Sequence, residues 1–169
     1  IWDGVTDPFI GYLVDKTNSK FGKNRPFMLI GNVILAVTSC IMFFVTHNLP
    51  EALRIPFFFV MAAIFYIGYT FQTVVTKSAQ TCLTNDPKQR PLFSVFDGIY
   101  NTALFTFAAA FVANFLVPKY GKLANVGLFQ EFWAYTAGIA FVFTILAMIA
   151  IAPKDREKYF GTGHAVKVT

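Results

Sequence analysis

Two carboxylates, Asp3 and Asp7, are the residues of this sequence whose type and spacing most directly suggest chemistry. They lie four residues apart and are the only charged residues in the stretch 1–14. That spacing places both on one face of a helix. Charge is costly inside a bilayer, so acidic residues in membrane-embedded segments usually bind ions, protons or substrates. The pair therefore predicts a binding site if this segment lies in a membrane.

Pro8 adds a third oxygen to the predicted site. A proline inside a helix removes the hydrogen bond to the carbonyl four residues earlier, which here is that of Gly4. Two carboxylates and a free carbonyl are hard oxygen ligands, which favour alkali or hard divalent cations. The same acids would bind a proton instead where burial disfavours their charged form. The residues alone leave both alternatives open.

The composition is that of a membrane protein. Of the 169 residues, 56% are hydrophobic and only 14% are charged, whereas a soluble domain has about 25% charged residues. The stretch 1–14 is predicted to be the second half of a helix, and the chain a fragment of an all-α polytopic membrane protein. Four further runs contain no charge and approach or exceed the roughly 20 residues that cross a bilayer: Phe27–Val45, Ile55–Thr76, Gly98–Pro118 and Phe132–Pro153.

The net charge of +5 is distributed unevenly along the chain. Ten of the 14 lysine and arginine residues fall in alternate connections, namely Asp15–Pro26, Asn85–Pro91 and the tail after Pro153. This alternation is the positive-inside pattern of multi-pass proteins, so the three segments are predicted to be cytoplasmic in a cell-membrane protein. Because the basic residues follow the membrane topology, they do not indicate a nucleic-acid partner.

Two further charged residues, Lys77 and Asp97, lie near the cytoplasmic ends of predicted helices. From the helix rise, Asp7, Lys77 and Asp97 lie roughly 12, 6–10 and 9 Å from those ends, so they would meet if their helices line one cavity. Each also has a purely structural explanation. Lys77 would extend its ammonium to the headgroups, and Asp97 would lie near the positive end of its helix dipole. The acids of the first helix would form a salt bridge to another helix.

A long motif connects these residues to a known family. The stretch Ile1–Gly11, followed by Asp15–Thr17 and Gly22–Pro26, resembles the second helix and following loop of the glycoside–pentoside–hexuronide:cation symporters. These transporters form the melibiose-permease branch of the major facilitator superfamily. The segment Leu83–Pro91 is similar to that family's loop between helices four and five. The resemblance spans essentially the whole chain.

The resemblance implies a twelve-helix transporter. Residues 1–153 would form helices two (truncated) to six of its N-terminal six-helix bundle, and residues 154–169 a cytoplasmic segment leading to the C-terminal half. The implied function is cation-coupled symport of glycosides, pentosides or hexuronides by alternating access, in which two bundles rock around a central site. The implied partners are the sugar, the lipid bilayer and the C-terminal half of the same transporter. No cofactor is implied beyond a coupling ion, sodium or a proton.

In that family the two acids of helix two are cation ligands, so the resemblance implies a sodium site at Asp3 and Asp7. The sequence departs from the family pattern on two other helices. The acid of helix four would fall near Thr73, where there is no carboxylate, and the arginine of helix five near Asp97. Lys77 lies one turn after Thr73 on the same face. We therefore hypothesise that Lys77 neutralises an acid in the cavity or binds an acidic sugar, which makes proton-coupled or uncoupled transport an alternative.

Two groups of residues complete the prediction. The substrate-binding group consists of polar or charged side chains on the predicted fourth and fifth helices: Gln72, Thr73, Lys77, Asp97, Tyr100 and Asn101. The cytoplasmic gate group resembles the contacts between bundles that hold one side of such transporters closed: Asp15, Gly22, Lys23 and Arg25.

Other functions remain possible at this point. A lysolipid carrier of the same branch or a non-transporting sensor would keep the fold, because fold alone does not establish activity. An enzyme is not expected, since the sequence offers no convincing nucleophile with a base, no Cys and His cluster with metal-ligand spacing, and no phosphate-binding loop.

Overall fold

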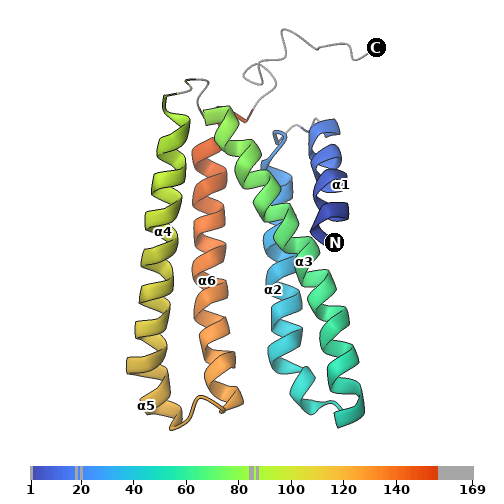
Figure 1. Cartoon of the computed structure of the whole chain (residues 1–169), viewed down its shortest axis with the longest axis vertical. Coiled ribbons are helices and arrows are strands. Elements are labelled where there is room, and N and C mark those ends of the chain that lie inside the picture. The colour runs from blue at the N-terminus through green and yellow to red at the C-terminus, as the bar shows by residue number, and fades with distance from the viewer. Residues whose placement is uncertain (1, 18, 20, 84–85, 87, 156–169) are drawn as a thin grey trace.

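The computed structural model describes residues 2–17, 19, 21–83, 86 and 88–155, with the side chains of 2–5, 81, 82 and 90 excepted. Within that part the fold is all-α, as predicted, and the helices stand side by side (Figure 1). In chain order they are α1 (Trp2–Lys16), α2 (Arg25–Phe44), the 3₁₀ turn η1 (Thr46–Asn48), α3 (Glu51–Leu83), α4 (Arg90–Phe111), the π-helical turn η2 (Val112–Leu116), α5 (Val117–Tyr120) and α6 (Val126–Ile151).

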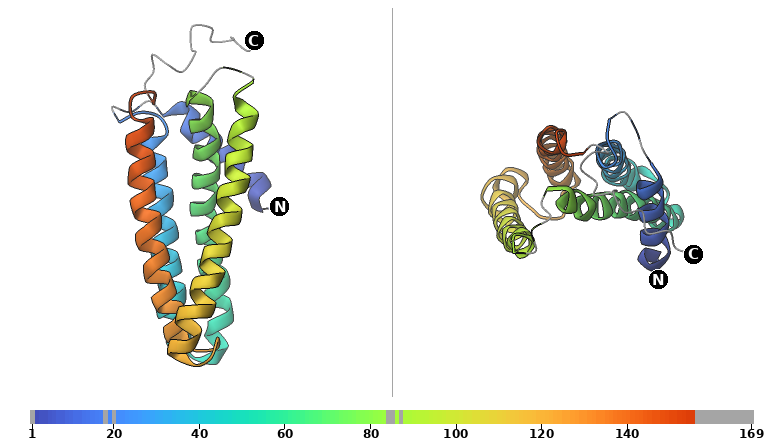
Figure 2. Two further views of the ribbon diagram at one scale, coloured as in Figure 1. Left: turned by 90° about the vertical axis from the view of Figure 1, so that its left-hand side faces the viewer. Right: turned by 90° about the horizontal axis from the view of Figure 1, so that it is seen from above.

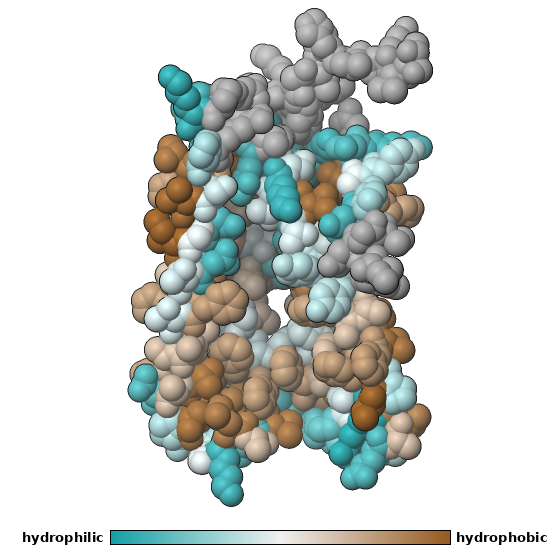
Figure 3. All heavy atoms as spheres, viewed as in Figure 1, coloured by the Kyte–Doolittle hydropathy of each residue, from teal (hydrophilic) through white to brown (hydrophobic). Residues whose placement is uncertain are grey.

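Four stretches are long and apolar enough to cross a membrane, namely Arg25–Asn48, Glu51–Gln80, Pro91–Tyr120 and Val126–Ile151. Each contains or largely overlaps one predicted span, which confirms the prediction of a multi-pass membrane protein. The helices extend beyond the predicted spans because a charge such as Lys77 ends a hydrophobic run without ending a helix. Hydrophobic side chains cover the middle and lower parts of the molecule in Figure 3, and polar ones gather at its ends and in its upper half.

Prolines account for the local irregularities of these helices. Both α2 and α4 start with an Arg-Pro pair, because the missing N–H of proline costs little in the first turn of a helix. Pro118 instead follows a long helix whose backbone it cannot continue regularly. The turn before it, η2, adopts the wider π-helical form, as expected where proline removes a hydrogen bond and crowds the preceding carbonyl.

One end of the molecule holds most of the buried core. Here α1, α3 and α6 end and α2 and α4 begin, so we call it the basic end after the three basic segments that join it (Figure 1). Helix α2 packs against α3 and α6, and α1 packs against α3. The buried hydrophobic cluster between them consists of Ile10, Val14, Met28, Val75, Ala79 and Ile151.

Polar contacts join α2 to α6 farther along the bundle. Asn32, nearly buried, donates through its side-chain amide to the carbonyl of Ala140 at 3.3 Å and to the Thr144 hydroxyl. The indole N–H of Trp133 donates to Ser39 Oγ at 2.8 Å. In a membrane, where apolar burial does not distinguish one helix pairing from another, such bonds select the partner.

Two glycines allow α2 and α3 to approach closely. A methyl group on Gly68 would lie 2.8 Å from Ile34 Cγ2 and 3.1 Å from the backbone nitrogen of Leu35. On the other helix, a methyl group on Gly31 would lie 2.9 Å from Phe71 Cβ. The pairing of α2 with α3 therefore depends on the absence of side chains at these two positions.

We expect Gly68→Ala to destabilise the protein by about 1–3 kcal/mol, because the added methyl group overpacks the α2–α3 contact. The measurement is the thermal unfolding midpoint of the purified protein in detergent. Gly138→Ala is the matched control, since a methyl group there meets no atom within 4 Å. Equal midpoints for the two variants would contradict the close contact.

Candidate functional site

Asp7 lies at the edge of the packed face of α1. Asp7 is exposed and precedes the fully buried Val14 by seven residues, so the two residues share a stripe of the helix. Helix α1 runs through Pro8, as predicted. The side chain of Asp3 lies outside the described part of the chain. The structure therefore supplies one described carboxylate for the predicted cation site.

A hydroxyl pair sets the register between α1 and α3. Thr6 Oγ1 lies 3.4 Å from Thr70 Oγ1, and Thr70 is only 1% exposed. Asp7 directly follows the first threonine. Lys77 follows the second by seven residues, so it lies on the same stripe of α3, about 10 Å nearer the basic end.

The helix ends agree with the depths predicted for Asp7 and Lys77, since Asp7 lies nine residues before the end of α1 and Lys77 six residues before the end of α3. The Thr6–Thr70 contact gives a larger difference in level. Because α1 and α3 run in the same direction and meet at Thr6 and Thr70, Lys77 is offset from Asp7 by about 9 Å along the helices. The described side chains form three ion pairs: Lys23–Asp15, Arg25–Asp155 and Lys119–Glu131. Within that set, neither Asp7, Lys77 nor Asp97 pairs with another.

Two of the predicted sugar-binding residues make contacts within the bundle. The side-chain amide of Gln72 donates to the carbonyl of Met28 at 2.8 Å, which joins α3 to α2. The hydroxyl of Thr73 donates to the carbonyl of Thr70 at 3.1 Å within its own helix. Both side chains therefore already form hydrogen bonds to helix backbone carbonyls. Lys77, on a neighbouring turn, is exposed.

The three predicted residues of α4 form an exposed polar group. Asn101 donates through its side-chain amide to Asp97 Oδ1 at 3.3 Å, which confirms that these residues share a face. Tyr100, adjacent to that asparagine, is exposed as well. Seen from above, α1 and α4 lie at opposite ends of the tilted α3 (Figure 2). Lys77 is thus carried by the helix between the one that bears Asp7 and the one that bears Asp97.

The four predicted gate residues come together at the basic end. The ammonium of Lys23 pairs with the carboxylate of Asp15. Gly22 has a positive φ of 98°, which closes the turn after α1 as expected of a residue without Cβ. Arg25 begins α2, and its Nε lies 3.5 Å from a carboxylate oxygen of Asp155.

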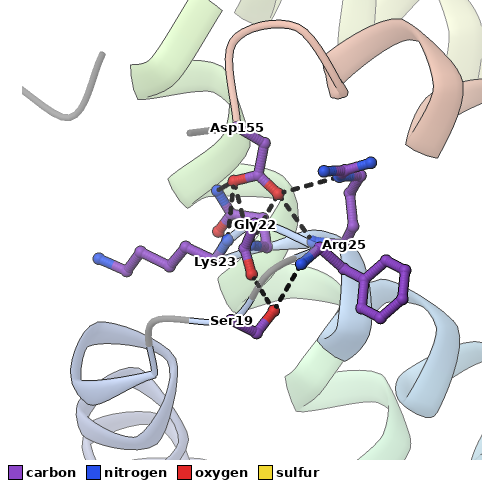
Figure 4. Close-up of polar contacts among 7 residues, drawn as sticks. Ser19, Gly22, Lys23, Arg25 and Asp155 are labelled. Carbon is purple, nitrogen blue, oxygen red and sulfur yellow. Dashed lines mark hydrogen bonds and ion pairs between the residues drawn. The ribbon is translucent and has the colours of Figure 1, made fainter. Parts of the chain in front are cut away.

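Asp155 is a residue that the sequence analysis missed. It is fully buried and accepts hydrogen bonds from the backbone N–H groups of Lys23, Asn24 and Arg25 (Figure 4). It was assigned only to a cytoplasmic segment after the last helix. The one available signal was an acidic residue within a basic tail, directly after the end of a membrane span.

The described part of the chain contains no group of three or more His, Cys, Asp or Glu residues that would hold a metal ion. A metal site at the acids of α1 therefore remains a prediction, which also requires Asp3. The geometry that is described consists of an exposed carboxylate on the short helix α1, and of an exposed lysine on α3 and a polar group on α4, both in membrane-length helices.

Comparison with known proteins decides the family. The family model described as "MFS/sugar transport protein" matches residues 1–166, nearly the whole chain. The chain belongs to the MFS/sugar transport protein family. Its members are membrane transporters, so the expectation that this chain is not an enzyme is confirmed.

Individual members of the MFS/sugar transport protein family match at modest identity. Uncharacterized symporter YjmB of Bacillus subtilis (strain 168) is 29% identical over 144 residues, covering 80% of this chain and 31% of that protein. Putative glycoside/cation symporter YagG of Escherichia coli (strain K12) is 33% identical over 90 residues, covering 53% and 19%. Glucuronide carrier protein homolog of the same strain is 26% identical over 144 residues, covering 83% and 30%.

The chain spans about a third or less of the length of these curated relatives. No solved structure matches it. The expected relation to sugar symporters is therefore confirmed at the level of the family, for a portion of such a transporter.

Proposed function

We propose that this chain is part of a cation-coupled sugar symporter that works by alternating access. Its membership of a sugar-transport family, its membrane-length helices and relatives named as symporters support the proposal. In this proposal the basic end is cytoplasmic, in accord with the positive-inside pattern. Residues 1–153 are helices two to six of the N-terminal bundle, and residues 154–169 lead to the C-terminal half.

The observation that carries the proposal is the contact of α1 with α3 at Thr6 and Thr70. It holds α1, with its exposed Asp7, against the membrane-length helix α3. An acidic residue in a membrane segment is retained at high cost and usually serves an ion, a proton or a substrate. We infer that Asp7, together with Asp3, binds the coupling cation, which is sodium or a proton. Neutralising these acids would make sugar binding favourable, and the coupling must act equally in both directions.

Lys77 determines the class of sugar in this proposal. It is an exposed cation on the helix between α1 and α4. An ammonium binds a carboxylate more strongly than it binds a neutral hydroxyl, because the hydrogen bond is charge-assisted. One relative is named a glucuronide carrier protein homolog. We therefore infer that the substrate is a hexuronide whose carboxylate pairs with Lys77.

Polar groups on α4 would bind the sugar hydroxyls. Asp97 and Asn101 already form a hydrogen-bonded pair on one face, and Tyr100 lies next to them in the chain. Such a pair offers both donors and acceptors. Gln72 and Thr73 have a supporting role in this proposal, because their side chains make the helix contacts described above.

The test is sugar uptake by the full-length transporter in membrane vesicles. We expect Lys77→Ala to raise the KM for a hexuronide by about tenfold or more, since it removes one charge-assisted bond, and to leave the KM for the matching neutral glycoside within about twofold. Lys88→Ala, a lysine of the exposed loop before α4, is the matched control. Equal effects of Lys77→Ala on both sugars would contradict the assignment, and no uptake of any sugar would contradict the proposed function.

A further inference from the structure

A residue far along the chain caps the N-terminus of α2. The Asp155 carboxylate accepts hydrogen bonds from the backbone N–H groups of Lys23 at 3.2 Å, Asn24 at 3.1 Å and Arg25 at 3.1 Å, and from the Asn24 side-chain amide at 3.1 Å. The first N–H groups of a helix have no partner within the helix. Asn24, the residue at the capping position, makes no side-chain capping bond. The acceptor comes instead from the turn after α6, about 130 residues later.

Lys154, the residue before Asp155, caps the C-terminus of a helix. Lys154 Nζ donates to the carbonyl of Leu83, the last residue of α3, at 2.9 Å. A helix carries partial positive charge at its N-terminus and partial negative charge at its C-terminus. The positive Lys154 therefore lies at the C-terminus of α3, and the negative Asp155 lies at the N-terminus of α2. Each charge meets a helix end of the opposite sign. Two consecutive residues thus connect the end of α6 to both α2 and α3.

We propose that Lys154 and Asp155 act as a clamp that makes the basic ends of α2, α3 and α6 move as one body. Asp155 is the positioning residue of the clamp, because it holds the backbone of the two gate residues Lys23 and Arg25. In a transporter, this carboxylate would hold the gate residues in place relative to the end of α6. The proposed effect on transport rests on the function proposed above, whereas the clamp itself does not.

Burial makes the Asp155 contact sensitive to its charge. The carboxylate is fully buried, and Arg25 Nε at 3.5 Å is the ion-pair partner that compensates its charge. A buried carboxylate is tolerated only where it is paired and hydrogen-bonded. Asparagine has nearly the same size but is neutral, and its NH2 group cannot accept a hydrogen bond. Asp155→Asn therefore weakens the clamp with little change of volume.

The first measurement is backbone hydrogen exchange in the full-length transporter without substrate. For Asp155→Asn we expect exchange in the peptide that covers residues 23–25 to accelerate by about tenfold or more, because hydrogen bonds to a charged group are among the stronger ones. Glu131→Gln is the matched control, since it removes a carboxylate that is paired with Lys119 at the opposite end of the molecule. Unchanged exchange at residues 23–25 in Asp155→Asn would overturn the clamp.

The second measurement separates gate positioning from a simple structural cap. We expect Asp155→Asn to change the maximal uptake rate by about fivefold or more and the KM by less than about twofold, because the gate affects movement and not the sugar site. Faster exchange with an unchanged rate would overturn the positioning role. If transport is absent even in the unmodified protein, the exchange result still tests the clamp while the proposed function fails.

A second variant keeps the proposal testable if Asp155→Asn does not fold. Lys154→Met removes only the exposed hydrogen bond to the Leu83 carbonyl. We expect faster exchange at the C-terminal turn of α3 and a smaller rate change of the same sign. Unchanged exchange and unchanged rate in Lys154→Met would overturn the two-helix clamp.

Discussion

Replacing Asp7 with asparagine is expected to reduce cation-accelerated sugar uptake by about 100-fold. Coupling between two bound ligands is typically worth about 1–3 kcal/mol, and each 1.4 kcal/mol corresponds to a factor of ten. Asp7 directly follows Thr6, the residue that contacts α3, and its own side chain is exposed. Asparagine retains the size of the side chain and removes the charge that the coupling ion neutralises.

The measurement compares uptake under an imposed sodium gradient, an imposed proton gradient and no gradient. Loss of the sodium response would assign a metal site to Asp7, and loss of a response to protons alone would assign a proton site. Glu51→Gln is the matched control, because Glu51 is an exposed acid in the first turn of α3 at the end remote from the basic end. If Asp7→Asn kept in full every gradient response of the unmodified transporter, the proposed role would be contradicted.

Gly22→Ala is expected to cost about 3–5 kcal/mol of stability and to disrupt the gate loop. The added methyl group would lie 2.3 Å from Asp155 Oδ2 and 2.4 Å from the Asp155 carbonyl oxygen, at a φ of 98° that disfavours a side chain. The left-handed backbone accounts for about 1–2 kcal/mol of this cost. Displacement of the buried carboxylate from its donors accounts for the remainder.

Gly121→Ala separates these two causes. Gly121 also has a positive φ, 75°, but a methyl group there meets no atom within 4 Å. The control therefore measures the backbone cost alone, and the difference in thermal unfolding midpoint between the two variants measures the displacement of Asp155. Equal midpoints would show that Gly22 is needed only for its turn and not for the approach of the carboxylate.

The membrane character of the chain was predictable from the sequence. Hydropathy determines which segments partition into a bilayer, so the four charge-free runs located the four spans. The positions of helix ends were less accurate, because Lys77 and Asp97 interrupt apolar runs but not helical hydrogen bonding. The family was identifiable too, since the motif around Asp3 and Asp7 is long.

The contacts of the proposed gate residues could be predicted only in part. Its four residues lie close together in the chain, so local sequence was sufficient to group Asp15, Gly22, Lys23 and Arg25. The partner Asp155 lies about 130 residues away, and its burial depends on where α6 ends beside the start of α2. No local sequence pattern predicts a contact between residues so far apart in the chain.

By itself, the sequence therefore determined the family, the all-α class and the membrane segments, and it grouped the proposed gate residues in one loop, because these follow from hydropathy, charge and contiguous motifs. Only the tertiary structure decided the roughly 9 Å offset between Asp7 and Lys77, the use of Gln72 in a helix contact and the capping of α2 by Asp155. The physical reason is that helix register is set by side chains meeting across an interface, such as Thr6 with Thr70. Counting residues from the end of each helix separately does not give the register between two helices.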